Sequence, residues 1–310
     1  MMFIRASAVA LLIAAAALCV EPTREIVFDS GQFRWPTIPG FHGSRIYFRD
    51  QARHNRVALY STDGRAEATF DTPESAGSLP EVLTLAIDSD GTVAVAWQAA
   101  ASASGAKPSA GIDYHSPNGK LLRSIDTGSF IPAHLSFAPD HTLWSFGWQR
   151  DPFEPRRPDP EDYPTLRKFD PDWRQVAAFL PRALFAQEPA FPSWQRRQIA
   201  IAHDRIGVLA HPSARNAKRE WVETNFEGKL IGRWEVPFNV DRTAITNDGR
   251  VYLESGENSA RVVAQLDRAS GTWKKVAAPP PGILCGAEGN DLVFADWVKG
   301  QLHLRWYPGL

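Results

Sequence analysis

The sequence predicts an all-β fold: a six-bladed β-propeller of four-stranded antiparallel blades, whose ring is closed by pairing of the N- and C-terminal strands. Three observations predict this fold. Two kinds of β-hairpin alternate along the chain, one unmatched strand lies near each end, and the chain after residue 20 has no long helical stripe of apolar residues.

The first kind of hairpin is an alternating apolar run, a polar turn and a second apolar run. Period-two alternation marks strands, and an Asp-Gly pair between them marks a tight turn, as at Asp90-Gly91 and Asp248-Gly249. Copies of this hairpin occupy residues 83–97, 133–144, 199–209 and 243–253, with a weaker copy at 284–294.

A second kind of hairpin lies between successive copies of the first and leads through a basic or polar residue into another apolar strand. Its copies occupy residues 57–65, 112–120, 166–174, 223–229 and 264–272. Two hairpins per unit, repeating about every 40 to 60 residues, are typical of a four-stranded propeller blade.

These units make five clear blades and a split sixth. The first blade extends from about residue 41 to residue 70, and we expect residues 45–48 to form its inner strand. Residues 301–307 have no following strand, and residues 25–28 have no preceding partner. Pairing these two segments removes two exposed strand edges, which would otherwise favour aggregation. We therefore predict that the two ends of the chain close the ring.

The Asp-Gly-centred blade resembles the six-bladed propellers of the broad NHL, TolB-like and gluconolactonase-like superfamily, over nearly the whole chain after the leader. The resemblance implies the architecture but not the function, because this fold carries both interaction scaffolds and enzymes. The gluconolactonase-like members hold a divalent cation in the central channel with Glu, Asn and Asp. Their N-terminal Gly-Glu-Gly-Pro-type segment is absent from residues 25–31, so we carry over no metal ligand.

The N-terminus predicts export. Arg5 precedes an apolar run at residues 8–18, which is shorter than a membrane-spanning helix, and a polar exit follows. We therefore expect a signal peptide at residues 1–20, a single propeller domain at 21–310, and a periplasmic or secreted protein. An uncleaved anchor and lipid attachment at Cys19 are the alternatives; bulky Leu18 disfavours the second. Without the leader only Cys285 remains, and we expect it to be a buried apolar residue.

Composition and motifs narrow the function. A formal net charge of −1 gives no overall field to attract nucleic acid, so we predict no nucleic-acid partner, no membrane span after the leader, and a monomer. The sequence contains no phosphate loop, dinucleotide fingerprint, paired-Cys zinc motif or Gly-x-Ser-x-Gly elbow. We predict no cofactor.

Four polar residues share one position of the repeat, six residues before a turn aspartate, and three charged residues lie just outside them. The four are Thr84, His134, Gln198 and Arg242, and the three are Glu81, Arg197 and Asp241. At the start of the innermost strands they would converge on the channel mouth, where they could bind an anion or polarise a carbonyl. A hydrated channel whose polar walls satisfy one another is the competing interpretation.

Long connections between the second and third strands would reach the same face. They occupy residues 98–111, 149–164 and 211–220, and long loops gathered on one rim favour binding there. We expect the partner to contact Phe153, Arg156, Arg157, Tyr163 and Trp194. Asp159, Glu161 and Asp162 could collect calcium, but a solvated charge cluster is the simpler interpretation.

We therefore expect an exported, non-catalytic propeller that binds a ligand or protein through its loop-rich face. The alternative is a metal-dependent hydrolase or lactonase that acts at the central channel with a divalent cation. A structural component of the cell envelope is a third possibility. Tightly bound metal would favour the enzyme, whereas a partner protein would favour the binding module.

Overall fold

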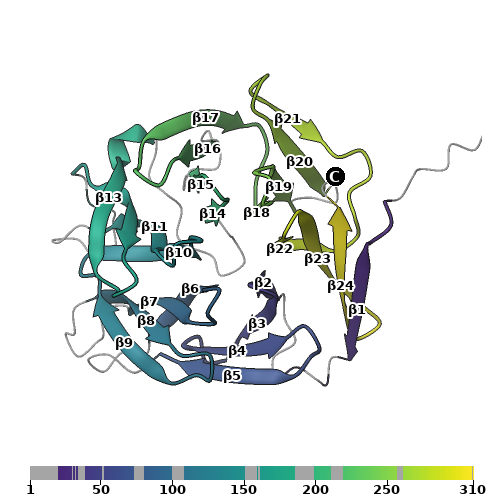
Figure 1. The fold of residues 1–310 in the computed structure, drawn as a ribbon, viewed down its shortest axis with the longest axis horizontal. Helices are drawn as coiled ribbons and strands as arrows, with labels where there is room; N and C mark the ends of the chain where they lie inside the picture. Colours follow the sequence, from purple (N-terminus) through teal and green to yellow (C-terminus); the bar gives the residue numbers. More distant parts are fainter. Residues whose placement is uncertain are drawn as a thin grey trace, which may run out of the picture.

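The computed structural model contains six four-stranded antiparallel sheets arranged as blades around a central axis (Figure 1). The structure describes residues 20–29, 31, 33, 39–50, 52–72, 80–99, 108–150, 159, 161–185, 199–210, 219–256, 261–308 and 310. Residues 1–19 of the predicted leader lie outside this part of the chain. The prediction of a six-bladed β-propeller is confirmed.

Each blade consists of four strands that follow one another from the axis outward. Blade 1 is β2 (Gly40–His42), β3 (Arg45–Arg49), β4 (Arg56–Ser61) and β5 (Ala66–Asp71), and blade 2 is β6 (Glu81–Ile87), β7 (Val93–Ala99), β8 (Ser109–His115) and β9 (Leu121–Asp126). Blade 3 is β10 (Phe130–Phe137), β11 (Leu143–Gln149), β12 (Pro164–Phe169) and β13 (Gln175–Pro181), and blade 4 is β14 (Ile199–Ile201), β15 (Ile206–Ala210), β16 (Arg219–Thr224) and β17 (Leu230–Val236). Blade 5 is β18 (Arg242–Ile245), β19 (Val251–Ser255), β20 (Val262–Asp267) and β21 (Thr272–Lys275), and blade 6 is β22 (Ile283–Glu288), β23 (Asp291–Val298), β24 (Gln301–Pro308) and β1 (Arg24–Asp29). A short 3₁₀ helix, η2 (Arg182–Leu184), follows β13.

Blade 6 joins the two ends of the chain. The N-terminal strand β1 pairs antiparallel with β24, in a register that places Glu25 opposite Arg305 and Phe28 opposite Leu302. Across this pair, Glu25 Oε1 accepts hydrogen bonds from His303 Nδ1 and Arg305 Nε, both at 2.8 Å. The predicted closure is therefore confirmed.

The first blade differs from the prediction in one respect. Residues 45–48 lie in β3, the second strand of blade 1, and the innermost strand is β2. Because β2 has only three residues, it is too short to produce a period-two pattern that sequence inspection could recognise.

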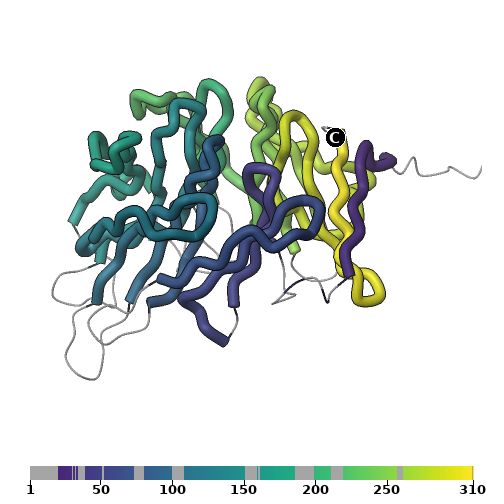
Figure 2. The backbone as a smooth tube through the Cα atoms, turned by 60° about the horizontal axis from the view of Figure 1, so that its bottom comes forward, coloured from purple at the N-terminus to yellow at the C-terminus, as the bar shows by residue number. Residues whose placement is uncertain are grey.

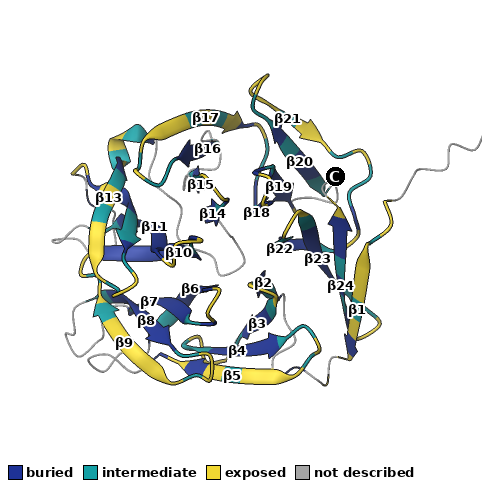
Figure 3. Cartoon of the chain, viewed as in Figure 1, coloured by how far each residue is buried: buried dark blue, intermediate teal, exposed yellow. Residues whose placement is uncertain are grey.

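Burial falls from the axis to the rim (Figure 3). In β7 every residue except Gln98 is buried, whereas five of the six residues of β9 are exposed. The middle strands of a blade are covered on both faces by the neighbouring blades, so they contain nearly continuous apolar residues.

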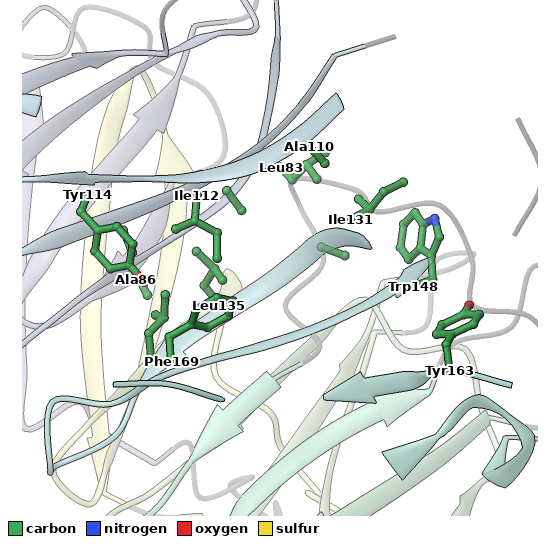
Figure 4. Close-up of a cluster of buried hydrophobic side chains, with 14 residues drawn as sticks. Leu83, Ala86, Ala110, Ile112, Tyr114, Ile131, Leu135, Trp148, Tyr163 and Phe169 are labelled. Carbon is green, nitrogen blue, oxygen red and sulfur yellow. The ribbon is translucent and has the colours of Figure 1, made fainter. Parts of the chain in front are cut away.

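Six hydrophobic clusters hold the ring together, one between each pair of successive blades. Figure 4 shows the cluster between blades 2 and 3, with Ile112 and Tyr114 from the former and Leu135 and Phe169 from the latter. Successive side chains of a strand point to opposite faces, so each blade contributes to two clusters.

The two faces of the ring carry different connections (Figure 2). We call the face where the innermost strands begin the loop face, and the opposite face the turn face. Every connection between strands at the turn face has two to five residues, whereas residues 150–163 and 182–198 connect strands at the loop face. Glycines with positive φ allow the tight turns; Gly91 has φ 88°, and its N–H donates to Asp88 O at 3.0 Å.

Candidate functional site

The loop face is the end of the channel where the sequence predicted a pocket. Antiparallel pairing places Glu81 beside Gln98, Phe130 beside Gln149 and Ile199 beside Val208 at this end of blades 2, 3 and 4. The long connections after β7, β11 and β15 therefore emerge next to the starts of innermost strands, as the repeat predicted.

Three of the four residues at the shared repeat position lie within the described chain. Thr84 is half-buried, whereas His134 is 3% exposed and its ring stacks on that of Phe146, with the centroids 6.4 Å apart. Arg242 is buried at the start of β18. Gln198 lies outside the described residues. Ligand binding by this set stays a prediction.

Arg242 stabilises the inner strand of the next blade. Its Nη1 donates to the Leu284 carbonyl at 3.5 Å, and Glu254 Oε2 accepts the Leu284 N–H at 2.8 Å. Glu254 also forms an ion pair with Arg261. The two ionised side chains thus hold one peptide segment at a bulge of β22.

Cys285 is the residue at this bulge, and it is a free, buried cysteine, as expected. Its Sγ lies 3.6 Å from the Pro39 carbonyl oxygen. Burial raises the pKa of the thiol to about 11, so it remains protonated and a poor nucleophile at neutral pH.

The charged residues predicted around the pocket also have structural partners. Arg49 Nη1 donates to Glu81 Oε1 at 3.0 Å and links blades 1 and 2. Asp241 Oδ2 accepts the Gly256 N–H at 2.9 Å and so closes the end of the β18–β19 pair. Arg197 lies outside the described residues.

Of the predicted partner-binding residues, only Tyr163 lies within the described chain. It is 4% exposed and packs with Trp148 and Ile131 in the cluster between blades 2 and 3 (Figure 4), so a partner would contact little of it in this conformation. Phe153, Arg156, Arg157 and Trp194 lie outside the described residues.

The predicted solvated cluster at residues 159–162 has a more specific role. Asp159 is 5% exposed, and its carboxylate accepts hydrogen bonds from Gln149 Nε2 at 2.9 Å and the Glu161 N–H at 3.0 Å. Asp162 Oδ1 accepts the Ala183 N–H at 2.8 Å. These two carboxylates therefore order the backbone of blade 3, so the prediction of a solvated charge is wrong for Asp159.

A cavity of about 210 Å³ lies on the axis toward the turn face. Residues of β2, β10, β14, β18 and β22 line it, together with residues of the turns that follow β2 and β18. Its polar side chains are His42, Ser136, Thr243 and Asn247. None of the seven residues predicted for the channel mouth is among them.

Sequence reasoning missed these four residues for identifiable reasons. Ser136 lies two positions after His134 on the same side of β10, so the repeat alignment could have found it. Asn247 lies beside the turn aspartate Asp248, where a structural role is the usual one. No sequence signal pointed to His42, at the end of the shortest innermost strand.

The potential metal-binding side chains that the structure describes are not arranged to hold a divalent cation. Among residues placed by the structure, no three His, Cys, Asp or Glu side chains are grouped closely enough to hold a metal ion. The lining residues that the structure describes include no Asp or Glu, and Ca²⁺ and Mg²⁺ sites in proteins depend on carboxylate oxygens.

Comparison with known proteins supports the fold. No family model and no curated protein matches the chain. A gluconolactonase from Xanthomonas campestris superposes with a TM-score of 0.51 at 16% identity, over 94% of this chain and 93% of that one. The chain has a propeller fold. A virginiamycin B lyase from Staphylococcus aureus gives a TM-score of 0.47 at 12% identity, over 91% and 98% of the two chains. The propeller of Dos1 gives 0.47 at 10% identity, over 85% and 75%.

At these identities the propeller's likeness to solved structures is a likeness of fold alone, and the six-bladed architecture that the Asp-Gly-centred blades implied is confirmed. In the described part of the propeller, no helix is long and apolar enough to cross a membrane.

Proposed function

We propose that this propeller is an exported, non-catalytic protein that binds a ligand or a partner protein at its loop face. The observation that carries this proposal is the unequal distribution of connections. The turn face carries only turns of two to five residues, whereas the loop face receives the connections at residues 150–163, 182–198 and 211–218. Long connections on a rigid ring provide a variable surface for recognition.

The partners of the charged side chains at the loop face also support binding rather than catalysis. A general acid or base must reach the substrate with a group that can exchange a proton. The Glu254 carboxylate instead pairs with Arg261 and with the Leu284 N–H, and Glu81 pairs with Arg49. These groups stabilise the rim of the channel.

Loss of two arginines from the long connection that follows β11 tests the binding surface. The bait is the purified propeller, and the readout is its affinity for the partner recovered from the cell envelope. The Arg156→Ala/Arg157→Ala variant is expected to bind at least tenfold more weakly. The matched control is Lys120→Ala/Lys229→Ala, which removes two exposed positive charges from the turn face and is expected to bind normally.

Two results would overturn the proposal. One is a partner whose affinity falls only in the turn-face control. The other is turnover of a lactone or ester by the purified propeller that chelation abolishes and a divalent cation restores, since this would establish the hydrolase alternative.

Export is proposed from the apolar run at residues 8–18 of the predicted leader. Sequencing of the mature N-terminus after expression of the full chain tests it, with cleavage expected near residue 20. A protein that keeps Met1 and fractionates with the cytosol would contradict export.

A further inference from the structure

The axial cavity lies at the opposite end of the channel from the proposed partner surface. Its walls come from five of the six innermost strands, and the turn residues Gly43 and Asn247 place it at the turn face. Asn247 is exposed. The cavity is therefore accessible from a face that carries no long connections.

The walls provide many hydrogen-bonding groups. Each innermost strand pairs with only one neighbour in its sheet. The half of its backbone N–H and C=O groups that faces the channel axis therefore has no partner within the sheet. Donors and acceptors alternate along such an edge. A hydroxyl group both donates and accepts, so hydroxyls are the ligand groups that fit an edge of this kind best.

Ser136 supplies the most specific observation. It is 4% exposed and lines the cavity, and its hydroxyl makes no hydrogen bond with any residue that the structure describes. Buried polar groups in native proteins are almost always satisfied by protein, water or ligand. The contents of the cavity must therefore supply the partner of this hydroxyl.

His42 contributes an uncharged ring to the wall. Its Nδ1 accepts the Ile87 N–H at 3.3 Å, which requires an unprotonated Nδ1 and so places the ring proton on Nε2. This bond also links the end of β2 to the end of β6 across the blade boundary. The ring is thereby oriented before any ligand arrives.

Charge and size restrict what the cavity can hold. No Asp, Glu, Lys or Arg is among the described residues that line it, so an ionic ligand would lose its hydration without gaining a counter-charge from them. At about 30 Å³ per water, 210 Å³ holds about seven waters or one compact organic molecule of similar volume.

We propose that the turn-face end of the channel is a binding site for a small neutral polyol, with Ser136 and Asn247 as hydrogen-bonding residues. This site is separate from the loop-face surface, so either proposal can fail while the other stands.

Calorimetric titration of the purified propeller with myo-inositol tests the site, with glycerol as a smaller neutral probe. Quinate, a polyhydroxylated ring that carries a carboxylate, is the charged control. We expect myo-inositol to bind at least tenfold more tightly than quinate. Failure of both neutral probes to bind, or tighter binding of quinate, would overturn the proposal, because the cavity would then hold water only or select charge.

Substitutions locate the binding. Ser136→Ala and Asn247→Ala are each expected to weaken myo-inositol binding about tenfold, the effect of one lost hydrogen bond. Ser145→Ala is the matched control, since Ser145 is a buried serine on the neighbouring strand β11 that does not line the cavity. Asn247 is exposed, so its variant should fold normally. Unchanged affinity in both variants would contradict the site.

Discussion

Glu223 lies on β16 with no exposed side-chain surface, and it links two blades. Its Oε1 accepts hydrogen bonds from Trp221 Nε1 at 2.9 Å and from Arg268 Nη2 of blade 5 at 2.7 Å. Arg205 Nη1 lies 3.3 Å from the other carboxylate oxygen. One buried charge is therefore shared by two arginines and an indole.

Glu223→Ala is expected to lower the free energy of unfolding by about 1 to 3 kcal/mol, because it leaves the buried Trp221 indole N–H without an acceptor and Arg268 without its carboxylate partner. Glu220→Ala on the same strand removes a more exposed pair with Arg233 and should cost about 0 to 1 kcal/mol. Urea unfolding of the two variants measures both values. Equal losses of unfolding free energy in the two variants would show that the buried Glu223 carboxylate stabilises the fold no more than an exposed ion pair does.

His141 predicts a pH dependence of stability. Its Nδ1 lies 2.9 Å from Asp88 Oδ2 of the neighbouring blade, and this hydrogen bond, with the charges of Asp88, Asp90 and Asp140, raises the pKa of His141 above 6.5. A raised pKa means that the folded state favours the protonated ring. The stabilisation is complete below about pH 6.5 and is lost as the pH rises through the folded pKa.

The difference in Tm between the native chain and His141→Gln is therefore expected to be largest near pH 6 and to shrink toward pH 8. Thermal melts at the two pH values measure it. A difference that is the same at both would show that the pair is not ionic.

At the scale of strands, bulges and close approaches shape the channel. The innermost strands β6, β10 and β22 each contain a register shift. At the shift in β10 the chain approaches β11 so closely that a Cβ on Gly147 would lie 1.9 Å from the Ile131 carbonyl oxygen. Only glycine fits where a backbone atom is that near.

Gly147→Ala is expected to separate β10 from β11 and to lower the free energy of unfolding by at least about 1 to 3 kcal/mol. Gly31→Ala serves as its control, because no heavy atom lies within 4 Å of the added Cβ and φ is not positive there. Denaturant midpoints compare the two. Equal midpoints for the two variants would mean that β10 can shift away from β11 at little cost in stability.

At the scale of the molecule, the fold depends on the β1–β24 pair. Phe28 of β1 packs with Leu302 and Leu304 in the cluster that joins blade 6 to blade 1. Loss of β1 would uncover this cluster and expose the edge of β24.

A chain that begins at residue 30 is expected to melt on the order of 10 °C below one that begins at residue 21, and to self-associate. Calorimetry and size-exclusion chromatography measure the two effects. An equally stable monomer without β1 would show that five complete blades and three strands are sufficient.

The sequence predicted the blades well because each hairpin is local. Alternation and the turn at Asp90-Gly91 depend on residues within about a dozen positions of one another. Even the closure could be inferred, since residues 25–28 and 301–307 each lacked a partner. The three-residue strand β2 was missed because so short a strand has no period of its own.

The predicted pocket was a weaker inference for a physical reason. A shared repeat position predicts how far along the channel axis a residue lies in its blade. Whether its side chain is buried, and which groups it bonds to, depend on the neighbouring blade. Arg242 bonds to Leu284 and Glu81 to Arg49, each across a blade boundary that no local pattern describes.

The sequence by itself determined the number of blades, the closed ring and the face that receives the long connections, because strands, turns and connection lengths are properties of short segments. Only the tertiary structure decided which polar residues face the axis and where the channel is open. Those depend on how six innermost strands from distant parts of the chain pack around one another.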